Sequence, residues 1–325
     1  MASALTSNAS PATETSVAQS SAVPVERPAQ LAVRARHAAL YAVRSLAESW
    51  RAFRAARRGD GLALAAALMR MRAKHFLWKV SPRWIFQREQ LFGWTLNCFD
   101  YYEMITTFEI IFLAREYRFS PRDARPRIID CGSNIGLSLL FFKREYPESV
   151  ILAFEPDPQT FSLLRKNVEQ NGLPGIELHN LALGGSPGSR VLFCDSERPG
   201  STAMTLVPGC GLGLRKTVQC ALLSEFIRED VDLLKLDIEG AELEVIADLV
   251  STGKIRHVQQ MAIEYHPVLF PDYDGYSWLR ETLVSNGFEC QLRSGALLPF
   301  GSPAPPPVTL FACRPAPTVN SQPAP

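Results

Sequence analysis

Short apolar runs alternate with longer segments of helical periodicity from residue 126 onward. The runs that we expect to be strands are 127–130, 150–154, 176–178, 231–236, 258–265, 288–292 and 308–312, with possible short strands at 191–194 and 218–221. Helical patterns lie between them, at 136–146, 158–171, 241–249 and 276–286. Strands that alternate with helices of about ten or more residues indicate βαβ units. The pattern therefore predicts a doubly wound α/β fold with a mostly parallel sheet and helices on both faces.

The segments outside this alternation differ from it in composition. Residues 1–30 are mostly Ala, Ser, Thr and Pro, and residues 314–325 are rich in proline. Neither segment has apolar periodicity, so we expect two disordered tails. Residues 31–80 have helical periodicity and many arginines, and residues 81–125 are rich in aromatic side chains that are expected to be core or a lid. The main domain is then expected at residues 126–313.

The net charge of +1 conceals an uneven distribution. Up to Pro126 there are 18 basic against 10 acidic residues, whereas Arg127 to Arg293 has 15 against 23. The basic helical segment, residues 31–79, has two interpretations: peripheral contact with an anionic membrane surface, or a helical cover packed on the main domain with its arginines solvated. The acidic main domain would repel phosphates, so we expect no nucleic-acid partner.

The cysteines and the hydropathy of the chain indicate the cellular compartment in which we expect the protein. The chain has 7 cysteines, scattered and without a CxxC pair, which indicates reduced thiols rather than a disulfide framework or a zinc site. No secretory signal pattern is found at the start, and no apolar run approaches the roughly 18 residues of a membrane span. We expect a cytoplasmic protein, with membrane-peripheral attachment as the alternative that the basic segment leaves open.

Candidate chemistry lies at the ends of the first two expected strands, where ligands bind in such sheets. The first strand runs into Asp130-Cys131-Gly132-Ser133-Asn134-Ile135-Gly136. The GxxxG spacing places Asn134 where the GxGxxG loop of a dinucleotide site needs glycine, which disfavours NAD. Glu155 ends the second strand, where an acid accepts hydrogen bonds from ribose hydroxyls. Ribose without pyrophosphate indicates an adenosyl ligand, although Glu155 alone could also be an acid at a helix N-terminus.

Four segments together resemble the FkbM family of S-adenosylmethionine-dependent methyltransferases. They are the loop 130–136, Phe154-Glu155-Pro156-Asp157-Pro158, Asn180-Leu181-Ala182-Leu183-Gly184, and residues 231–242 with the wording LKLDIEGAE. The last segment is the most specific of the four. The resemblance extends from about residue 108 to residue 292 and includes neither end of the chain.

The resemblance implies a class I, Rossmann-like methyltransferase fold with a seven-stranded sheet, in which residues 308–312 form the antiparallel strand. It also implies that S-adenosylmethionine is the cofactor. The glycine loop would surround the amino acid part of the cofactor, the acid after the second strand would hold the ribose, and the segment at 180–182 would border the adenine. The implied cofactor-binding residues are Asp130, Gly132, Asn134, Gly136, Glu155, Asn180 and Ala182.

The acceptor side is expected at the ends of the fourth and fifth strands of the main domain. Methyl transfer to a hydroxyl needs positioning and a base that takes the proton. The candidates are Asp237, Glu239, Glu264 and His266. A histidine titrates near neutrality, but His266 could also only cap a strand end through a backbone hydrogen bond. Clustered carboxylates more often orient hydroxyl groups than bind metal, so no metal is expected.

The sequence thus predicts O-methylation of a hydroxyl on a small molecule, a glycan or a lipid-linked sugar. The alternative from another class is a non-catalytic cofactor-binding or scaffold protein with the same fold. The joint presence of Gly132, Gly136, Glu155, Asp237 and Glu239 argues against that alternative, because a degenerate site would be free to lack some of them.

Overall fold

The computed structural model describes residues 61–80, 87–195, 201, 204–209, 213–293 and 307–315. The tail expected at residues 1–30 lies outside these residues, as do all but the first two residues of the tail expected at 314–325 and the first part of the basic extension, 31–60. These expectations stay predictions.

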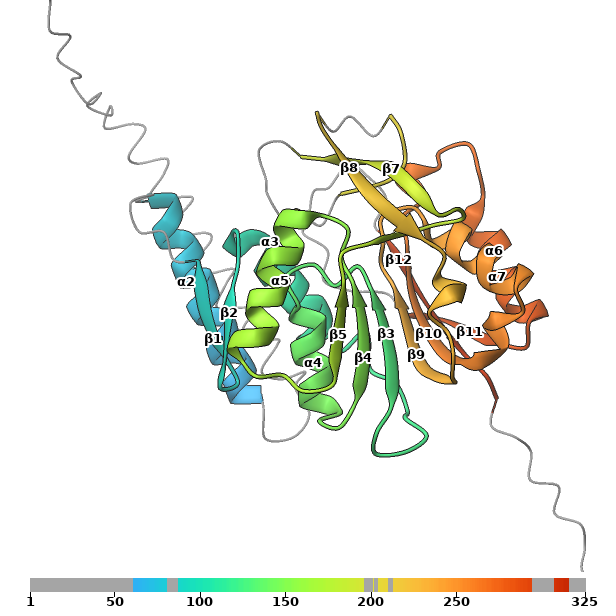
Figure 1. Ribbon diagram of the computed structural model, residues 1–325. Coiled ribbons are helices and arrows are strands. Elements are labelled where there is room, and N and C mark those ends of the chain that lie inside the picture. The colour runs from blue at the N-terminus through green and yellow to red at the C-terminus, as the bar shows by residue number, and fades with distance from the viewer. Residues whose placement is uncertain are drawn as a thin grey trace, which may run out of the picture. The chain divides into compact units, whose positions relative to one another are not determined.

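A seven-stranded sheet forms the centre of the main domain (Figure 1). Its order is β11-β12-β10-β9-β3-β4-β5. The bounds are β3 Arg127–Cys131, β4 Val150–Phe154, β5 Ile176–His179, β9 Val231–Leu236, β10 Val258–Tyr265, β11 Glu289–Arg293 and β12 Val308–Cys313. Only β12 is antiparallel to its two neighbours in this sheet, β10 and β11. The expected class I methyltransferase fold, with residues 308–312 in the inserted antiparallel strand, is confirmed.

The register of the parallel strands brings their carboxyl ends to one edge. Cys131 at the end of β3 pairs with Phe154 at the end of β4 and with Leu236 at the end of β9. The six residues of β9 are all buried, as expected for a strand covered on both faces. The turns that follow these three strands therefore lie side by side.

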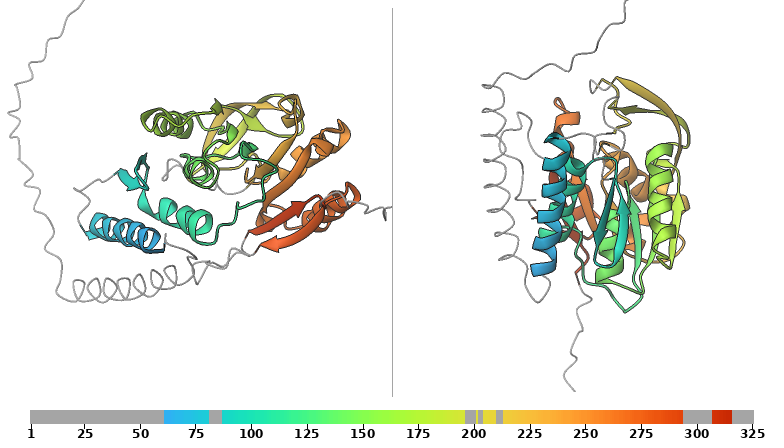
Figure 2. Two further views of the ribbon diagram at one scale, coloured as in Figure 1. Left: turned by 90° about the horizontal axis from the view of Figure 1, so that it is seen from below. Right: turned by 90° about the vertical axis from the view of Figure 1, so that its left-hand side faces the viewer.

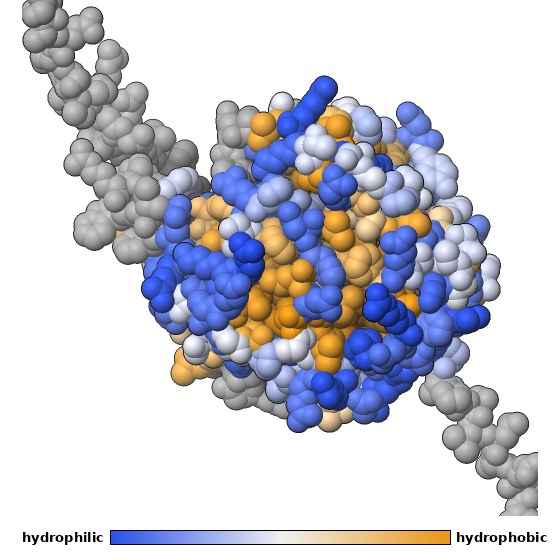
Figure 3. Space-filling model, viewed as in Figure 1, coloured by the Kyte–Doolittle hydropathy of each residue, from blue (hydrophilic) through white to orange (hydrophobic). Residues whose placement is uncertain are grey.

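Helices cover both faces of the sheet (Figures 1 and 2). Their bounds are α4 Leu137–Glu145, α5 Pro158–Gln170, α6 Glu242–Ser251 and α7 Gly275–Ser285, with short helical turns at Leu223–Glu225, Lys254–His257 and Pro267–Leu269. Asp157 caps α5 by accepting from the Thr160 N–H, and Asp274 caps α7 in the same way. One core lies beneath α4 and α5 and another beneath α6 and α7. On the face drawn in Figure 3, apolar residues gather in the middle, around β5 and the helices beside it, with polar residues around them.

The aromatic-rich segment belongs to the first of these cores. It contains the hairpin β1 Arg88–Leu91 and β2 Trp94–Asn97, the helix α3 Tyr101–Phe108 and a π-helical turn, Glu109–Leu113. Phe108 and Phe112 stack at 4.9 Å between ring centroids, and the Phe112 ring meets Phe141 of α4 edge-on. The aromatic side chains therefore serve packing, one of the two roles expected for them.

Helix α2, Gly61–Val80, is the described part of the basic extension, and it packs against α3 (Figure 2). Leu64, Leu68 and Met71 are buried in the same core. In the same helix, Arg70 and Lys74 pair with the buried Glu89 at 3.1 and 2.7 Å. Within the described residues, no helix has the length and apolar character needed to cross a bilayer.

A three-stranded sheet lies beyond the carboxyl edge of the main sheet (Figure 1). It consists of β6 Ala182–Leu183, β7 Gly188–Cys194 and β8 Leu214–Ala221 in the order β6-β8-β7. The strands expected at 191–194 and 218–221 are thus the ends of longer ones. Arg190 of β7 binds Glu244 of α6 at 2.6 Å, and Lys216 of β8 pairs with Asp157. These ion pairs join the small sheet to the main domain.

Candidate active site

The loop after β3 is held by buried polar contacts. Asp130 is fully buried, and its carboxylate accepts from the Ser138 hydroxyl at 2.5 Å and faces the Lys235 ammonium at 3.1 Å. The Lys235 ammonium also donates to the carbonyls of Cys131 and Gly132, at 3.1 and 2.8 Å. A lysine in the middle of a buried strand therefore fixes the start of the loop.

Both glycines of the loop have left-handed φ, +82° at Gly132 and +95° at Gly136. A Cβ at Gly132 would lie 1.8 Å from the Asp237 carbonyl oxygen, and one at Gly136 would lie 2.8 Å from Leu164 of α5. Gly132 thus allows the turn after β3 to touch the turn after β9, and Gly136 allows the loop to pack on α5. These glycines are required by backbone conformation and packing, whether or not a ligand is bound.

Glu155 follows β4 and is turned toward the glycine loop. Its two carboxylate oxygens accept from the backbone N–H groups of Asn134 and Asp157, each at 3.0 Å. Burial raises the pKa of Glu155 to about 8, although the two N–H donors act in the opposite direction. The structure thus brings Asn134 and Glu155 together, and the contact of Glu155 with a ribose stays a prediction.

The two residues expected at the adenine lie farther along the chain. The Asn180 side chain donates to the carbonyls of Glu155 and Pro156 at 2.8 and 3.0 Å, so it fixes the segment after β4. Ala182 lies in β6, opposite Cys220, with its side chain buried in the small sheet's core. Their contact with adenine stays a prediction.

The turn after β9 carries Asp237 and Glu239 in a strained conformation. Glu239 has a φ of +54°, which non-glycine residues rarely adopt. The buried Glu242 carboxylate accepts from the N–H groups of Ile238 and Gly240, at 3.0 and 2.9 Å, and so stabilises this turn. Burial raises the pKa of Glu242 to about 7.

Asp237 contacts Tyr117 of the aromatic segment and Lys235 of β9. Its Oδ2 atom accepts from the Tyr117 hydroxyl at 3.2 Å and lies 3.5 Å from the Lys235 ammonium. The same ammonium lies 5.3 Å from the centroid of the Tyr117 ring. Burial lowers the pKa of Lys235, but the charges of Asp130 and Asp237 outweigh it, and the pKa is raised. Lys235 therefore stays charged and links the two turns.

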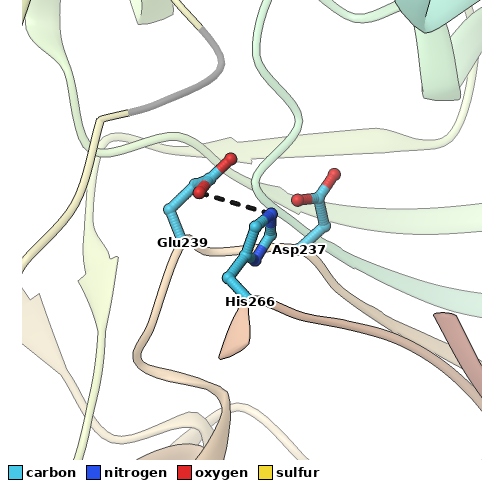
Figure 4. A group of neighbouring side chains, drawn as sticks. All are labelled: Asp237, Glu239 and His266. Atoms are coloured by element: carbon cyan, nitrogen blue, oxygen red, sulfur yellow. Dashed lines mark ion pairs between the residues drawn. The ribbon is translucent and has the colours of Figure 1, made fainter. Parts of the chain in front are cut away.

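All four residues predicted for the acceptor side come together; we call Asp237, Glu239, Glu264 and His266 the acceptor cluster. The His266 Nε2 atom lies 3.4 Å from Glu239 Oε2 and 3.7 Å from Glu264 Oε1 (Figure 4). The ring lies between Glu239 and Asp237, and the ligand atoms of these three residues are all within 4.8 Å of one another. The carboxyl ends of β9 and β10 thus present three carboxylates and one imidazole to a common space.

Like charges and burial determine the ionisation of the cluster. Burial raises the pKa of Glu239 and that of Glu264 well above their usual range, and the charge of Asp237 adds to both shifts. Burial lowers the pKa of His266, so the ring is neutral at neutral pH. A neutral imidazole beside a hydroxyl group can accept its proton.

Comparison with known proteins shows which protein family the chain resembles. A family model described as the methyltransferase FkbM domain matches residues 130–290. Methyltransferase 1 of Beauveria bassiana is 34% identical over 43% of this chain and 64% of its own length. Methyltransferase sdnD of Sordaria araneosa is 32% identical over 45% of this chain and 71% of its own length.

The chain belongs to the FkbM family of methyltransferases.

A further relative of this FkbM-family chain is the 31-O-demethyl-FK506 methyltransferase FkbM of Streptomyces tacrolimicus, at 28% identity. That match covers 47% of this chain and 61% of the relative. The chain therefore aligns with less than two thirds of the length of two of these three relatives.

Sequence reasoning missed three residues of the FkbM-family site: Lys235, Tyr117 and Glu116. The sequence could have indicated Lys235, because a lysine inside a mostly apolar strand needs buried partners. Glu116 is buried, and its burial, with the charge of Asp237, raises its pKa to about 7. Tyr117 and Glu116 come from the aromatic segment, and nothing in their local sequence indicates that they reach the end of β9.

The aromatic segment also borders the glycine loop. A cavity of about 20 Å³ lies between them, lined by Phe99, Glu103 and Met104 on one side and by Asn134 and Ile135 on the other. A space of this size holds about one water molecule. The segment therefore packs directly beside the loop, as a lid would, although its role as a lid stays a prediction.

Proposed function

We propose that this protein is an S-adenosylmethionine-dependent O-methyltransferase that acts on a hydroxyl group of a small molecule, a glycan or a lipid-linked sugar. One observation carries the proposal: the cofactor loop and the acceptor cluster meet where Gly132 touches the backbone of Asp237. A methyl group held on the loop side would then lie next to groups that can bind and deprotonate a hydroxyl. Family membership supports the reaction class.

The cofactor is proposed to lie along the loop 130–136 with its ribose at Glu155. The Glu155 carboxylate would accept from the ribose hydroxyls, and the glycine turn gives close access to the backbone. Asp130 and Lys235 are already paired with each other, so their part is to hold the loop. The residues present fit an adenosyl ligand, since no second glycine at position 134 makes room for a pyrophosphate.

The transfer itself needs little covalent chemistry from the protein. The methyl carbon leaves the sulfonium sulfur as the C–S bond breaks, the C–O bond forms, and the hydroxyl proton passes to a base of the acceptor cluster. His266 is suited to take it because its pKa is lowered. The name of the Streptomyces relative records transfer to an oxygen atom, which supports a hydroxyl acceptor.

Calorimetry with S-adenosylmethionine tests the cofactor site. We expect saturable binding that Glu155→Ala abolishes and Glu177→Ala leaves unchanged, because Glu177 is an exposed carboxylate of the adjacent strand. Absence of binding to the intact chain at millimolar cofactor would contradict the proposal.

Methyl transfer is tested with radiolabelled cofactor and fractions of small molecules, glycans and lipid-linked sugars. We expect label in one fraction, in a product with a new methyl ether. Cofactor binding without transfer to any fraction would favour the alternative, a non-catalytic binding or scaffold protein. Peripheral membrane contact through residues 31–79 is a separate proposal, which binding to anionic vesicles tests.

A further inference from the structure

The acceptor cluster has the composition of a metal site. Asp237, Glu239 and His266 form the only group of three or more such side chains that lie close enough together among the described residues. Two of them follow β9 and the third follows β10, so the main sheet fixes their relative positions. From sequence we expected no metal, because clustered carboxylates more often orient hydroxyl groups than bind metal.

The distances suit a small divalent ion. Protein nitrogen and oxygen ligands lie about 2.0–2.2 Å from such an ion, which separates neighbouring ligands by roughly 3.0–3.6 Å. The distance from His266 Nε2 to Glu239 Oε2 is 3.4 Å, within this range. The ligand atoms of all three residues lie within 4.8 Å of one another, so side-chain rotation closes the rest of the gap.

Two buried polar atoms at the cluster lack partners within the described part of the chain. They are Nδ1 of His266, a residue that is 9% exposed, and Oε1 of Glu116, a residue that is 4% exposed. The opposite ring atom of His266, Nε2, is turned into the cluster (Figure 4). The described partners of Nε2 are the Glu239 and Glu264 carboxylate oxygens at 3.4 and 3.7 Å, which is long for a hydrogen bond, so this atom can direct its lone pair to an ion.

The charges at the cluster also favour a cation. Asp237, Glu239 and Glu264 gather there, and the neighbouring ammonium of Lys235 is shared with Asp130. The described contacts of the Asp237 carboxylate, from Tyr117 and from Lys235, both go to Oδ2. Oδ1 is therefore left for another positive partner.

We propose that Asp237, Glu239 and His266 bind one divalent transition-metal ion, and that the hydroxyl oxygen of the acceptor fills a coordination position that these residues leave open. One imidazole and two carboxylates suit Mn²⁺ or Zn²⁺, whereas Mg²⁺ prefers oxygen ligands alone. The role of the ion toward the acceptor rests on the proposed function. The binding of the ion to the three side chains does not rest on it. With the ion bound, Nε2 of His266 is a ligand, and the hydroxyl proton then passes to Glu264, the member of the cluster that does not bind the ion.

The test uses the full chain, freed of metal by a chelator, and Mn²⁺ alone. Free Mn²⁺ is measured by electron paramagnetic resonance, and we expect one saturable site per chain. Asp237→Asn and Glu239→Gln keep the side-chain shape and should weaken binding by about tenfold or more each, as should His266→Gln. Circular dichroism checks that each variant is folded.

The matched control is His257→Gln. His257 also lies against a carboxylate, at 2.9 Å from Asp230, but this pair is exposed and outside the cluster. Mn²⁺ binding should be unchanged in this variant. An intact chain without a saturable site at millimolar Mn²⁺ would overturn the proposal, and so would folded Asp237, Glu239 and His266 variants that bind as tightly as the control.

Cofactor binding is measured on the same metal-free protein, which separates the two proposals. Binding of S-adenosylmethionine without Mn²⁺ binding overturns the metal site and leaves the proposed function. Mn²⁺ binding without cofactor binding overturns the proposed function and leaves the metal site.

Discussion

The carboxylates of the proposed cofactor side and those of the proposed acceptor side differ in the polar groups that surround them. On the cofactor side, Asp130 has a lysine and a serine hydroxyl, and Glu155 has two backbone N–H donors. On the acceptor side, the described ion-pair partner of the Glu239 and Glu264 carboxylates is the His266 ring, at 3.4 and 3.7 Å. The cofactor side is thus nearly complete without a ligand, whereas the acceptor side is not.

This difference between the two sides arises because the groups around their carboxylates come from different parts of the chain. Backbone donors come with the turns after β3 and β4, whose conformation is fixed locally by glycines and a helix cap. Side chains at the ends of β9 and β10 converge from separate turns, and their charges repel one another. The second arrangement persists because the surrounding sheet holds it, and such unsatisfied clusters are typical of sites that bind a ligand.

Substitution at Gly132, where the two sides touch, should have the largest effect on stability. Gly132→Ala introduces a Cβ 1.8 Å from the Asp237 carbonyl, and neither backbone can move without disturbing a central strand. We expect the free energy of unfolding to fall by about 5 kcal/mol or more, measured by urea denaturation. Gly172→Ala is the control: its φ is +57° but nothing lies within 4 Å of the new Cβ. It should cost about 1–2 kcal/mol. Similar losses in both variants would show that the contact is unimportant.

The next largest effect should come from Lys235, which is shared by both sides. Lys235→Met leaves the buried Asp130 and the half-buried Asp237 without their cation. We expect a loss of about 3–5 kcal/mol in the free energy of unfolding. Arg127→Met, which breaks an exposed pair with Glu229, should cost about 1 kcal/mol or less. If Lys235→Met were as mild as this control, the two sides would not depend on a common charge.

The last effect should be a pH dependence of stability, to which Glu155 contributes on the cofactor side and the buried carboxyls with raised pKa contribute on the acceptor side. The Glu155 carboxyl has a pKa of about 8 in the folded chain against 4.5 as its ordinary value. The folded chain therefore keeps a proton that the unfolded chain has lost, and the stability contributed by this group falls as pH rises from 4.5 to about 8. The melting temperature of the unliganded chain should decline over this range, and less so in Glu155→Gln.

Titration of Glu155 should also affect cofactor binding, but here the ionised carboxylate is the favoured form. Ribose hydroxyls favour the ionised carboxylate, so binding below pH 8 releases a proton, and affinity rises by up to about tenfold per pH unit up to the pKa. Calorimetry in two buffers of different ionisation enthalpy measures the proton. Equal proton release from intact chain and Glu155→Gln would assign the titration to another group.

Much of the fold could be predicted from local sequence. The strands at 150–154, 231–236 and 258–265 were predicted with the bounds that the structure shows. The hydrophobic pattern sufficed there because strands of a covered parallel sheet are rich in apolar residues: 150–154 is a continuous apolar run, and the other two strands are mostly apolar. The small sheet was predicted only in fragments, because β7 and β8 are half exposed and their pairing depends on contacts distant in sequence.

By itself, the sequence determined a mostly parallel α/β fold with Asp130, Glu155, Asp237 and Glu264 at strand ends, because hydrophobic periodicity acts over a few residues. The class I arrangement was implied by the resemblance of short motifs to the FkbM family. The tertiary structure decided that Lys235 joins the two sides, that Tyr117 reaches Asp237, and that His266 stands among the carboxylates. Such contacts are set by the register of parallel strands and by the packing of a distant segment, and no local pattern encodes them.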